Sequence, residues 1–524
     1  MVVYTLPTSD SITTFWAKPD DSRTGDTYQV YLNGHLIGTT EKTHYTFEDL
    51  KPATNYELQI IRFRPEGEED PLEGVINVST DGEKEIIDVT KPPYKAVGDG
   101  KTMNTKALQR AIDDCGPRQR VYIPEGCFLT GGLKLHSDVD FYLEEGAILK
   151  GSEKPADYLP KIWSRFEGIE MECYQSLLNL GTLDHDGDHN CINVLIHGKG
   201  TISGGGRPLM DAIIEAEKKR LKDELIALGK GIEEYEKPDT IPGRARGRLI
   251  NMSNCRNVRV TGLHLENGAA WNVHMIYSRF CVMDHCSVYS RNIWNGDGWD
   301  PDSSNNCILF ACRFNTSDDS VAIKSGKNPE GNAIGRETRN IMIFDCVIEF
   351  GHGFAIGSEM SGGVDLVRIW DCDLAHSDFG IQIKGTPKRG GYVKHVYVKD
   401  CVMPRILALS VPYNDDGEPG PSVPKFSNYI FYRVKLTSMH LHEQKEALEP
   451  CNPIELRGFD GEGNEIEDVL LKEIEIYKPV VPEGGITERW YDDGTTDGYG
   501  NLVISKVKKL SMEQVDFIDR PYFE

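Results

Sequence analysis

The sequence predicts an all-β chain in which a solenoid of stacked coils follows a small β-sandwich. Glycine supplies 52 of the 524 residues, which favours a turn-rich β architecture over a helical bundle. Short segments rich in β-branched and aromatic residues fill the first part of the chain, and a loose internal repeat runs from Asn254 onward. Because the chain exceeds the usual size of one core, we expect two domains, at residues 1–88 and 89–524.

The expected sandwich contains five strand-like segments separated by turn signals: Ile12–Trp16, Tyr28–Leu32, Thr43–Phe47, Tyr56–Phe63 and Gly74–Ser79. Asn33-Gly34 is a strong hairpin dipeptide. The run Leu50–Tyr56 resembles the fibronectin type III signature, which implies that Tyr56 is the tyrosine of the corner. We therefore expect a fibronectin type III-like module that spaces or docks the second domain.

The second domain begins with a glycine turn that leads into an amphipathic helix within Tyr94–Cys115, with Asn104 or Thr105 as its N-cap. A second amphipathic helix, Asp211–Leu228, forms an insertion at about residues 208–240. The basic run Gly243–Arg248 follows it. This segment is either a solvated lid or interface element, or a set of arginines that meets an anionic ligand.

The repeat predicts coils that stack in a column and bury one continuous interior. Five blocks of similar sequence start at Phe280, Asn306, Asn340, Leu366 and His395. A cysteine recurs at the same place in each block: Cys286, Cys312, Cys346, Cys372 and Cys401. Metal binding would require clustered thiolates at C-x-x-C spacing, which these lack, so we interpret them as an inward ladder of small apolar groups.

The formal net charge of -24 excludes binding of nucleic acid by bulk attraction. No uninterrupted apolar run approaches a membrane span, so we expect no membrane partner. The first residues lack a basic region and a long apolar core, so we expect no signal peptide and a cytoplasmic location, where the 13 cysteines stay reduced. A trimmed signal peptide would instead imply secretion or a periplasmic location. The sequence leaves the oligomeric state unknown.

Carboxylates gather in W-N-G-D-G-W-D-P-D, Trp294–Asp302, and in the pair Asp318-Asp319. Adjacent turns of a solenoid would bring Asp297, Asp318 and Asp319 to one face. Three carboxylates on a rigid β surface suit hydrolysis of an acetal, in which one acid protonates the leaving oxygen and the others activate water. The alternative is that these aspartates only bond to the backbone of turns.

Three further motifs fall at comparable places in later coils: G-H-G at Gly351–Gly353, I-G-S-E-M-S-G-G-V at Ile356–Val364, and G-I-Q-I-K-G at Gly380–Gly385. With them, residues 85 to 480 resemble glycoside hydrolase family 28, the polygalacturonases and their relatives. The family motifs N-T-D, D-D, G-H-G and R-I-K align in order with Asn295–Asp297, Asp318-Asp319, Gly351–Gly353 and Gln382–Lys384. The resemblance implies a right-handed parallel β-helix.

The resemblance also implies an inverting single displacement without cofactor or metal. Asp318 would be the general acid, Asp297 and Asp319 would orient and deprotonate the water, and His352 would hold Asp318 or the substrate. The implied substrate is a pectic oligosaccharide, bound by Lys384, Gln382, Lys324, Glu359, Arg389 and Asn295. An inverting pair stands roughly 6.5–9.5 Å apart, and we expect neighbouring carboxylates to keep the acid protonated.

The sandwich module and the G-S-E-M-S-G-G-V stretch look most like bacterial exo-acting polygalacturonases, and we expect the helical insertion to close one end of the cleft. Gln382 departs from the family, because an arginine that forks onto a carboxylate is usual there. Either Arg389, Lys388 or the Arg244–Arg248 cluster compensates, or the leaving sugar is neutral, as in rhamnogalacturonan.

Two other classes stay open on the same fold. A non-catalytic carbohydrate-binding β-helix would not need three aspartates including a proton donor. A pectate lyase would need calcium ligands, and only Asp184–Asn190 resembles a calcium loop, without the bidentate glutamate.

Overall fold

The computed structural model describes residues 2–65, 67–229, 231, 241–411, 417–480 and 502–523. The chain forms two compact units, Met1–Ile86 with Gly116–Arg120, and Ile87–Cys115 with Val121–Glu524. Residues 230 and 232–240, the end of the predicted helical insertion, lie outside the described residues. Within the described ranges, no helix combines the length and apolar character that crossing a membrane requires.

The first unit consists of two antiparallel sheets. One contains β1 (Val3–Pro7), β2 (Ile12–Trp16) and β5 (His44–Phe47), and the other contains β4 (His35–Thr40), β3 (Thr27–Leu32), β6 (Asn55–Phe63), β7 (Glu69–Pro71) and β8 (Ile76–Ser79). Trp16, Tyr28 and Leu58 are buried in its core. The Tyr56 hydroxyl accepts the Lys51 amide at 2.9 Å, the contact expected of a corner tyrosine.

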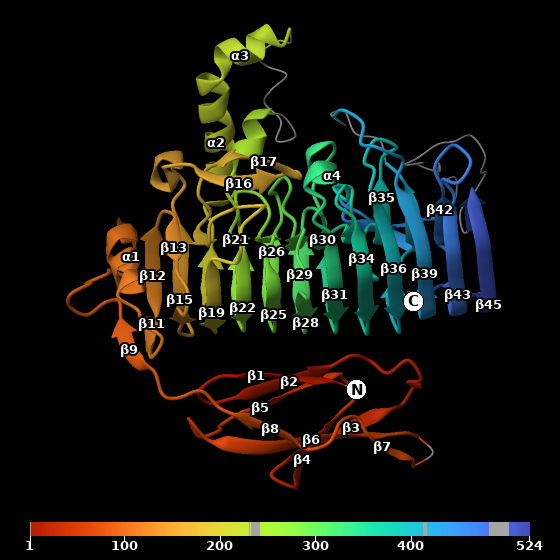
Figure 1. Cartoon of the computed structure of the whole chain (residues 1–524), viewed down its shortest axis with the longest axis horizontal. Coiled ribbons are helices and arrows are strands. Elements are labelled where there is room, and N and C mark those ends of the chain that lie inside the picture. The colour runs from red at the N-terminus through yellow and green to blue at the C-terminus, as the bar shows by residue number, and fades with distance from the viewer. Residues whose placement is uncertain are drawn as a thin grey trace. The chain divides into compact units, whose positions relative to one another are not determined.

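The second unit is a parallel β-helix, whose coils each add a strand to up to three parallel sheets (Figure 1). The first sheet contains β9 (Glu85–Asp88), β11 (Gln119–Ile123), β14 (Asp140–Leu143), β19 (Cys191–Gly198), β22 (Cys255–Thr261), β25 (Arg279–Asp284), β28 (Ile308–Phe310), β31 (Thr338–Phe344), β34 (Val364–Trp370), β36 (Tyr392–Lys399), β37 (Val402–Met403), β39 (Lys425–Leu436), β43 (Ile466–Tyr477) and β45 (Val507–Ile518). The second contains β10 (Asp99–Met103), β12 (Gly126–Thr130), β15 (Ala147–Gly151), β20 (Thr201–Ser203), β23 (His264–Glu266), β26 (Ser287–Ser290), β29 (Arg313–Thr316) and β32 (Val347–Phe350). The third contains β13 (Leu133–Leu135), β18 (Leu178–Leu180), β21 (Ile250–Ser253), β24 (Val273–Ile276), β27 (Trp299–Asp302), β30 (Val321–Ile323), β33 (Gly353–Ile356), β35 (Gly380–Gly385), β38 (Ile406–Ser410), β42 (Ile454–Arg457) and β44 (Leu502–Ser505).

Single left-handed residues make the sharp bends between the first and second sheets. They recur at His285, Ala311, Asp345, Asp371 and Asp400, with φ between 50° and 54°. The next residue in every case is the recurrent cysteine, and all five of these cysteines are buried in the core of the column. The predicted inward ladder is therefore confirmed.

Helices and hairpins decorate the column. α1 (Thr105–Asp113) buries Leu108, Ala111 and Ile112, as its apolar stripe predicts. The helical insertion begins with α2 (Gly206–Arg220) and α3 (Lys222–Ala227), which stand at the strand ends beside the hairpin β16 (Ile162–Phe166) and β17 (Ile169–Cys173) (Figure 1). The remaining elements are α4 (Glu330–Ile334), the 3₁₀ turns Pro155–Tyr158 and Ile241–Ala245, and the hairpin β40 (Met439–His442) and β41 (Ala447–Pro450).

Candidate active site

The turns that lead into the third sheet bring the motif residues together. Asp297 precedes β27, Asp318 and Asp319 precede β30, and His352 precedes β33. Backbone bonds fix these turns on one another, because the Gly298 amide donates to the Asp319 carbonyl at 3.0 Å and the His352 amide donates to the Asp318 carbonyl at 3.1 Å. The aspartates and the histidine therefore lie on neighbouring coils at one edge of the sheet, as the order of the motifs predicts.

Close packing requires the glycines of these turns. A Cβ on Gly351 would lie 2.5 Å from the Thr316 hydroxyl, and a Cβ on Gly353 would lie 2.4 Å from the Gly380 carbonyl. A Cβ on Gly296, where the family usually has threonine, would lie 2.8 Å from the Ser317 hydroxyl. Ser317 therefore occupies the space that a side chain at position 296 would need.

His352 links both neighbouring carboxylates. Its Nδ1 lies 3.3 Å from Asp318 Oδ1 and 3.5 Å from Asp319 Oδ1, and its Nε2 lies 3.6 Å from Glu443 Oε2. Lys384 Nζ donates to Asp319 Oδ2 at 2.9 Å. Glu443 comes from the turn of the β40–β41 hairpin, far along the chain, and no motif in the sequence points to it.

The aspartates differ in protonation. Burial, and then the charges of Asp300 and Asp318, raise the pKa of Asp297 well above its usual value. Burial opposes ionisation of Asp319, but Lys384 and His352 hold its pKa well below the usual range. Burial alone would lower the pKa of His352, but the hydrogen bonds with Asp318, Asp319 and Glu443 raise it well above its usual value.

The net pKa of Asp318 is lowered, although the neighbouring Asp319 carboxylate acts to raise it, as expected. Burial acts in that direction, but the hydrogen bond from His352 and its positive charge outweigh burial and lower the pKa of Asp318. The pKa shifts therefore favour a proton on His352 over one on Asp318. Asp300, which is fully buried beside this cluster, has a pKa raised well above normal by burial.

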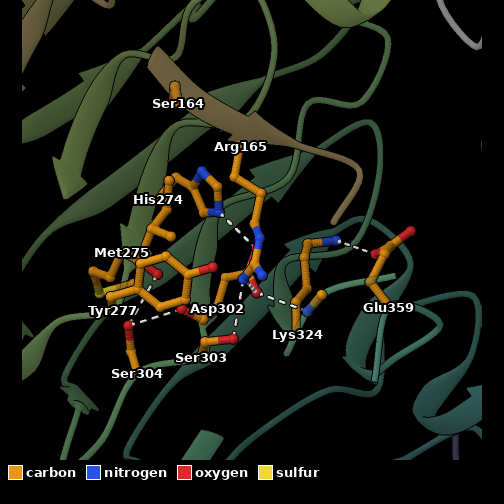
Figure 2. Close-up of polar contacts among 12 residues, drawn as sticks. Ser164, Arg165, His274, Met275, Tyr277, Asp302, Ser303, Ser304, Lys324 and Glu359 are labelled. Atoms are coloured by element: carbon orange, nitrogen blue, oxygen red, sulfur yellow. Dashed lines mark hydrogen bonds and ion pairs between the residues drawn. The ribbon is translucent and has the colours of Figure 1, made fainter. Parts of the chain in front are cut away.

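A buried network lies beyond Asp297 on the side of the β16–β17 hairpin. Lys324 Nζ lies 3.4 Å from Asp297 Oδ2 and 3.3 Å from Glu359 Oε2. Arg165 reaches from β16 to Asp302, where its Nη1 donates to Oδ1 at 2.9 Å (Figure 2). Both of these side chains are fully buried, and His274 lies beside them. This side of the site is therefore filled by protein.

The hairpin is also tied to the coil that carries Lys324. The Lys327 amide donates to the Gly168 carbonyl at 3.0 Å, and the Glu170 amide donates to Glu330 Oε1 at 2.8 Å. These contacts hold the hairpin against that coil. The helical insertion, which we expect to close one end of the cleft, contributes Arg207 to the wall of a cavity that Asp318 also lines.

The arginines that the sequence offered as substitutes for Gln382 are engaged within the protein. Arg389 is buried and donates to the Ser358 carbonyl at 3.0 Å and to Asn328 Oδ1 at 2.6 Å. Arg244 pairs with Glu167, and Arg246 is buried against Asn295 Oδ1, to which its Nη2 donates at 2.6 Å. Gln382 itself is only 2% exposed.

Two places among the described residues carry candidate ligands for a cation. Ligand atoms of Asp318, Asp319 and His352 lie within 4.8 Å of one another, close enough for a metal ion. The contacts of His352 Nδ1 with both carboxylates mean that a cation there would have to displace the imidazole proton. In the Asp184–Asn190 turn, the Asn254 amide donates to the Asp184 carbonyl at 2.7 Å, as in an ordinary side-chain-capped turn.

Comparison with known proteins identifies relatives of this chain. Residues 188–416 match Glycosyl hydrolases family 28. The chain is 25% identical over 457 residues to the exo-poly-alpha-D-galacturonosidase of Dickeya chrysanthemi, covering 76% of this chain and 73% of that one. It is 31% identical to a probable polygalacturonase of Vitis vinifera, covering 59% of each. The fold is similar to a family 28 exopolygalacturonase of Yersinia enterocolitica, with a TM-score of 0.80, 21% identity and coverage of 99% and 96%. An exopolygalacturonase of Thermotoga maritima matches with a TM-score of 0.64, 26% identity and coverage of 83% and 91%.

Proposed function

Because the chain is a pectin-degrading glycoside hydrolase with a family 28 domain, we propose that it hydrolyses galacturonate oligomers from one chain end, with inversion. The carrying observation is the placement of Asp297, Asp318 and Asp319 at one edge of the third sheet, with His352 against the last two. Relatives whose names specify exo-poly-alpha-D-galacturonosidase and exopolygalacturonase support the substrate and the mode of action.

Asp318 is the general acid in this proposal, because it is the most exposed of the three aspartates, at 27% of its side chain. A proton passes from His352 Nδ1 to Asp318 across a contact of 3.3 Å, and Asp318 donates it to the glycosidic oxygen as the C–O bond breaks. Asp319, kept ionised by Lys384, orients the water, and Asp297 takes its proton as the water attacks the anomeric carbon. General acid catalysis of this kind contributes roughly 10²- to 10⁴-fold in rate.

Cations on the glycone side support a uronate substrate. Lys324 and Lys384 are buried next to the aspartates, and each has a carboxylate partner within 3.4 Å. A galacturonate carboxylate that reaches these ammonium groups would take part in charge-assisted hydrogen bonds, which are about twice as strong as neutral ones.

The buried network behind Asp297 supports action at a chain end. The Arg165–Asp302 pair is fully buried, and the hairpin contacts to Lys327 and Glu330 hold β16 and β17 against the coil that carries Lys324. A polymer could then place only its terminal unit past the scissile bond.

A rhamnogalacturonan-type substrate is the second candidate, favoured by one observation. Gln382 stands where the family has a carboxylate-binding arginine, and the arginines expected to replace it are bonded to the protein. A neutral rhamnose on the leaving side would need no such arginine.

Product analysis decides between these proposals. The purified chain is incubated with galacturonan and rhamnogalacturonan oligomers labelled at the reducing end, and products are followed from the first minutes. The proposal predicts monomeric galacturonate and labelled chains shortened by one unit, without ultraviolet absorbance of an unsaturated sugar. Early mid-chain fragments would contradict the end-acting mode, and cleavage of the rhamnogalacturonan oligomers alone would favour the second candidate.

A further inference from the structure

An open cavity of about 540 Å³ lies directly beside the proposed acid. Asp318 and His352 form one part of its wall, whereas Asp297 and Asp319 are not among its lining residues. Arg207 of α2, Arg291 and Trp294 form another part. The cavity is therefore on the side of the scissile bond that Asp318 faces, where the leaving sugar belongs.

Trp294, which lines the cavity, is exposed enough to contact a sugar ring. It is 44% exposed, whereas Trp299 and Trp370 are 1% and 3% exposed and pack in the interior or against Phe344. The guanidinium of Arg207 lies over the Trp294 ring, 5.5 Å from its centre. An aromatic face beside a cation offers both stacking for the apolar face of a pyranose and a partner for its carboxylate.

Both arginines are held in place and still have N–H groups to offer. Arg207 is 46% exposed, and its Nε donates to both carboxylate oxygens of Asp211 at 3.0 Å. Arg291 Nη2 lies 2.9 Å from Glu446 Oε1, and its guanidinium stacks on Phe350 at 3.9 Å. Because a guanidinium carries five donors, each arginine keeps donors beyond these contacts.

The carboxylates around the cavity have partners of their own. Asp211 and Glu446 pair with the two arginines, and Glu443 Oε2 lies 3.6 Å from His352 Nε2. The carboxylate of a uronate that enters the cavity therefore competes with these protein carboxylates for the two arginines. It can accept two parallel hydrogen bonds from the N–H groups of a guanidinium that the protein carboxylates leave available.

We propose that Arg207, Arg291 and Trp294 form a specificity subsite for a galacturonate unit on the leaving-group side of the scissile bond. This inference rests on the proposed function, in which Asp318 is the acid. The subsite supplies the guanidinium that is missing at position 382, and it assigns a binding role to the helical insertion through Arg207.

The test removes each arginine and the substrate carboxylate, separately and together, and measures kcat/KM. Arg207→Gln and Arg291→Gln are compared with the wild-type chain on a galacturonate oligomer and on the same oligomer methyl-esterified at the unit on the leaving side. A charged hydrogen bond is worth about 1.5–3 kcal/mol, so each variant should lose roughly 10- to 100-fold in kcat/KM on the free acid. On the methyl ester, each variant should equal the wild-type chain within about threefold, since the shared contact is already absent.

Arg313→Gln is the matched control. Arg313 is 63% exposed, pairs with Glu349 at 3.2 Å and does not line the cavity, so this variant should keep wild-type kcat/KM on both substrates. Asp211→Asn distinguishes substrate binding by Arg207 from support of α2 by the Arg207–Asp211 ion pair. This variant breaks the ion pair, as Arg207→Gln does, but it leaves the Arg207 guanidinium available to the substrate. It should retain or raise kcat/KM on the free acid.

Several outcomes would overturn the subsite. Equal losses on the free acid and on the ester would show that the arginines only support the fold, and no loss in either variant would show that they do not bind the substrate. A tenfold loss of kcat/KM on the free acid in Asp211→Asn would likewise show that the arginine only supports the fold. Failure of the proposed function can be told apart from failure of the subsite, because the wild-type chain itself would then cleave neither galacturonate substrate.

Discussion

Replacement of Arg165 by methionine tests the buried network that closes the site. The Arg165 guanidinium donates to Asp302 Oδ1 at 2.9 Å and to the Ser303 hydroxyl at 3.0 Å. Without Arg165, the Asp302 carboxylate still accepts the Gly326 amide N–H at 3.1 Å and still lies 3.4 Å from His274 Nε2. Burial lowers the pKa of His274 to about 3, so this histidine supplies no charge at neutral pH. The variant therefore leaves a buried carboxylate without a cation.

The expected cost is large on the scale of protein stability. Breaking a buried ion pair by removing one partner costs about 3–5 kcal/mol, against a typical total of about 5–15 kcal/mol. An exposed pair such as Arg313 with Glu349, whose side chains are 63% and 46% exposed, is worth only about 0–1 kcal/mol. The double variant Arg165→Met with Asp302→Asn should be more stable than Arg165→Met alone, because the unpaired charge is gone.

Urea unfolding followed by circular dichroism measures these differences, with Arg313→Gln as the exposed control. Because Arg165 also tethers β16, the Arg165→Met variant should release more mid-chain fragments from labelled galacturonate oligomers than the wild-type chain does. A loss of stability no greater than that of Arg313→Gln, together with unchanged products, would refute the role assigned to the pair.

Three further predictions concern the site and the column. The raised pKa values of Asp297 and His352 predict a bell-shaped dependence of kcat/KM on pH. On the acidic side, kcat/KM falls as pH drops through the pKa of Asp297, because only the ionised carboxylate acts as the base. On the basic side, kcat/KM falls as pH rises through the pKa of His352, because the histidine then loses its proton. An acidic limb near the ordinary carboxyl value of about 4 would contradict this assignment. Proton NMR of the first product should show the inverted anomer, and retention would exclude single displacement. Twelve of the 13 cysteines are buried, so a thiol reagent should modify at most Cys127 before unfolding; rapid reaction of more thiols would contradict the ladder.

Much of the column could be predicted because its information is local and repeated. The block from Asn340 contains a left-handed bend at Asp345, an inward Cys346 and strands on either side, all within a few residues. The catalytic cluster was predictable for a related reason, since stacking converts motifs on successive coils into neighbours. The register of adjacent coils is enough to bring together Asp297, Asp319 and His352.

The closing network and the cavity depend on contacts that no short motif encodes. Arg165 and Asp302 are separated by 137 positions, and Glu443 reaches His352 from a hairpin near the end of the chain. Arg207 belongs to an insertion outside the repeat. The lowered pKa of Asp318 follows from the position of the His352 ring, which a count of neighbouring carboxylates does not give.

Turnover of Asp318→Asn on a galacturonate trimer tests the central claim most directly, with binding of the trimer measured alongside. The substitution removes the donated proton and keeps the shape of the side chain. We predict a loss of roughly 10²- to 10⁴-fold in kcat with little change in affinity. Turnover near that of the wild-type chain would contradict the assignment of Asp318 as the acid and, with it, the hydrolytic site built on these coils.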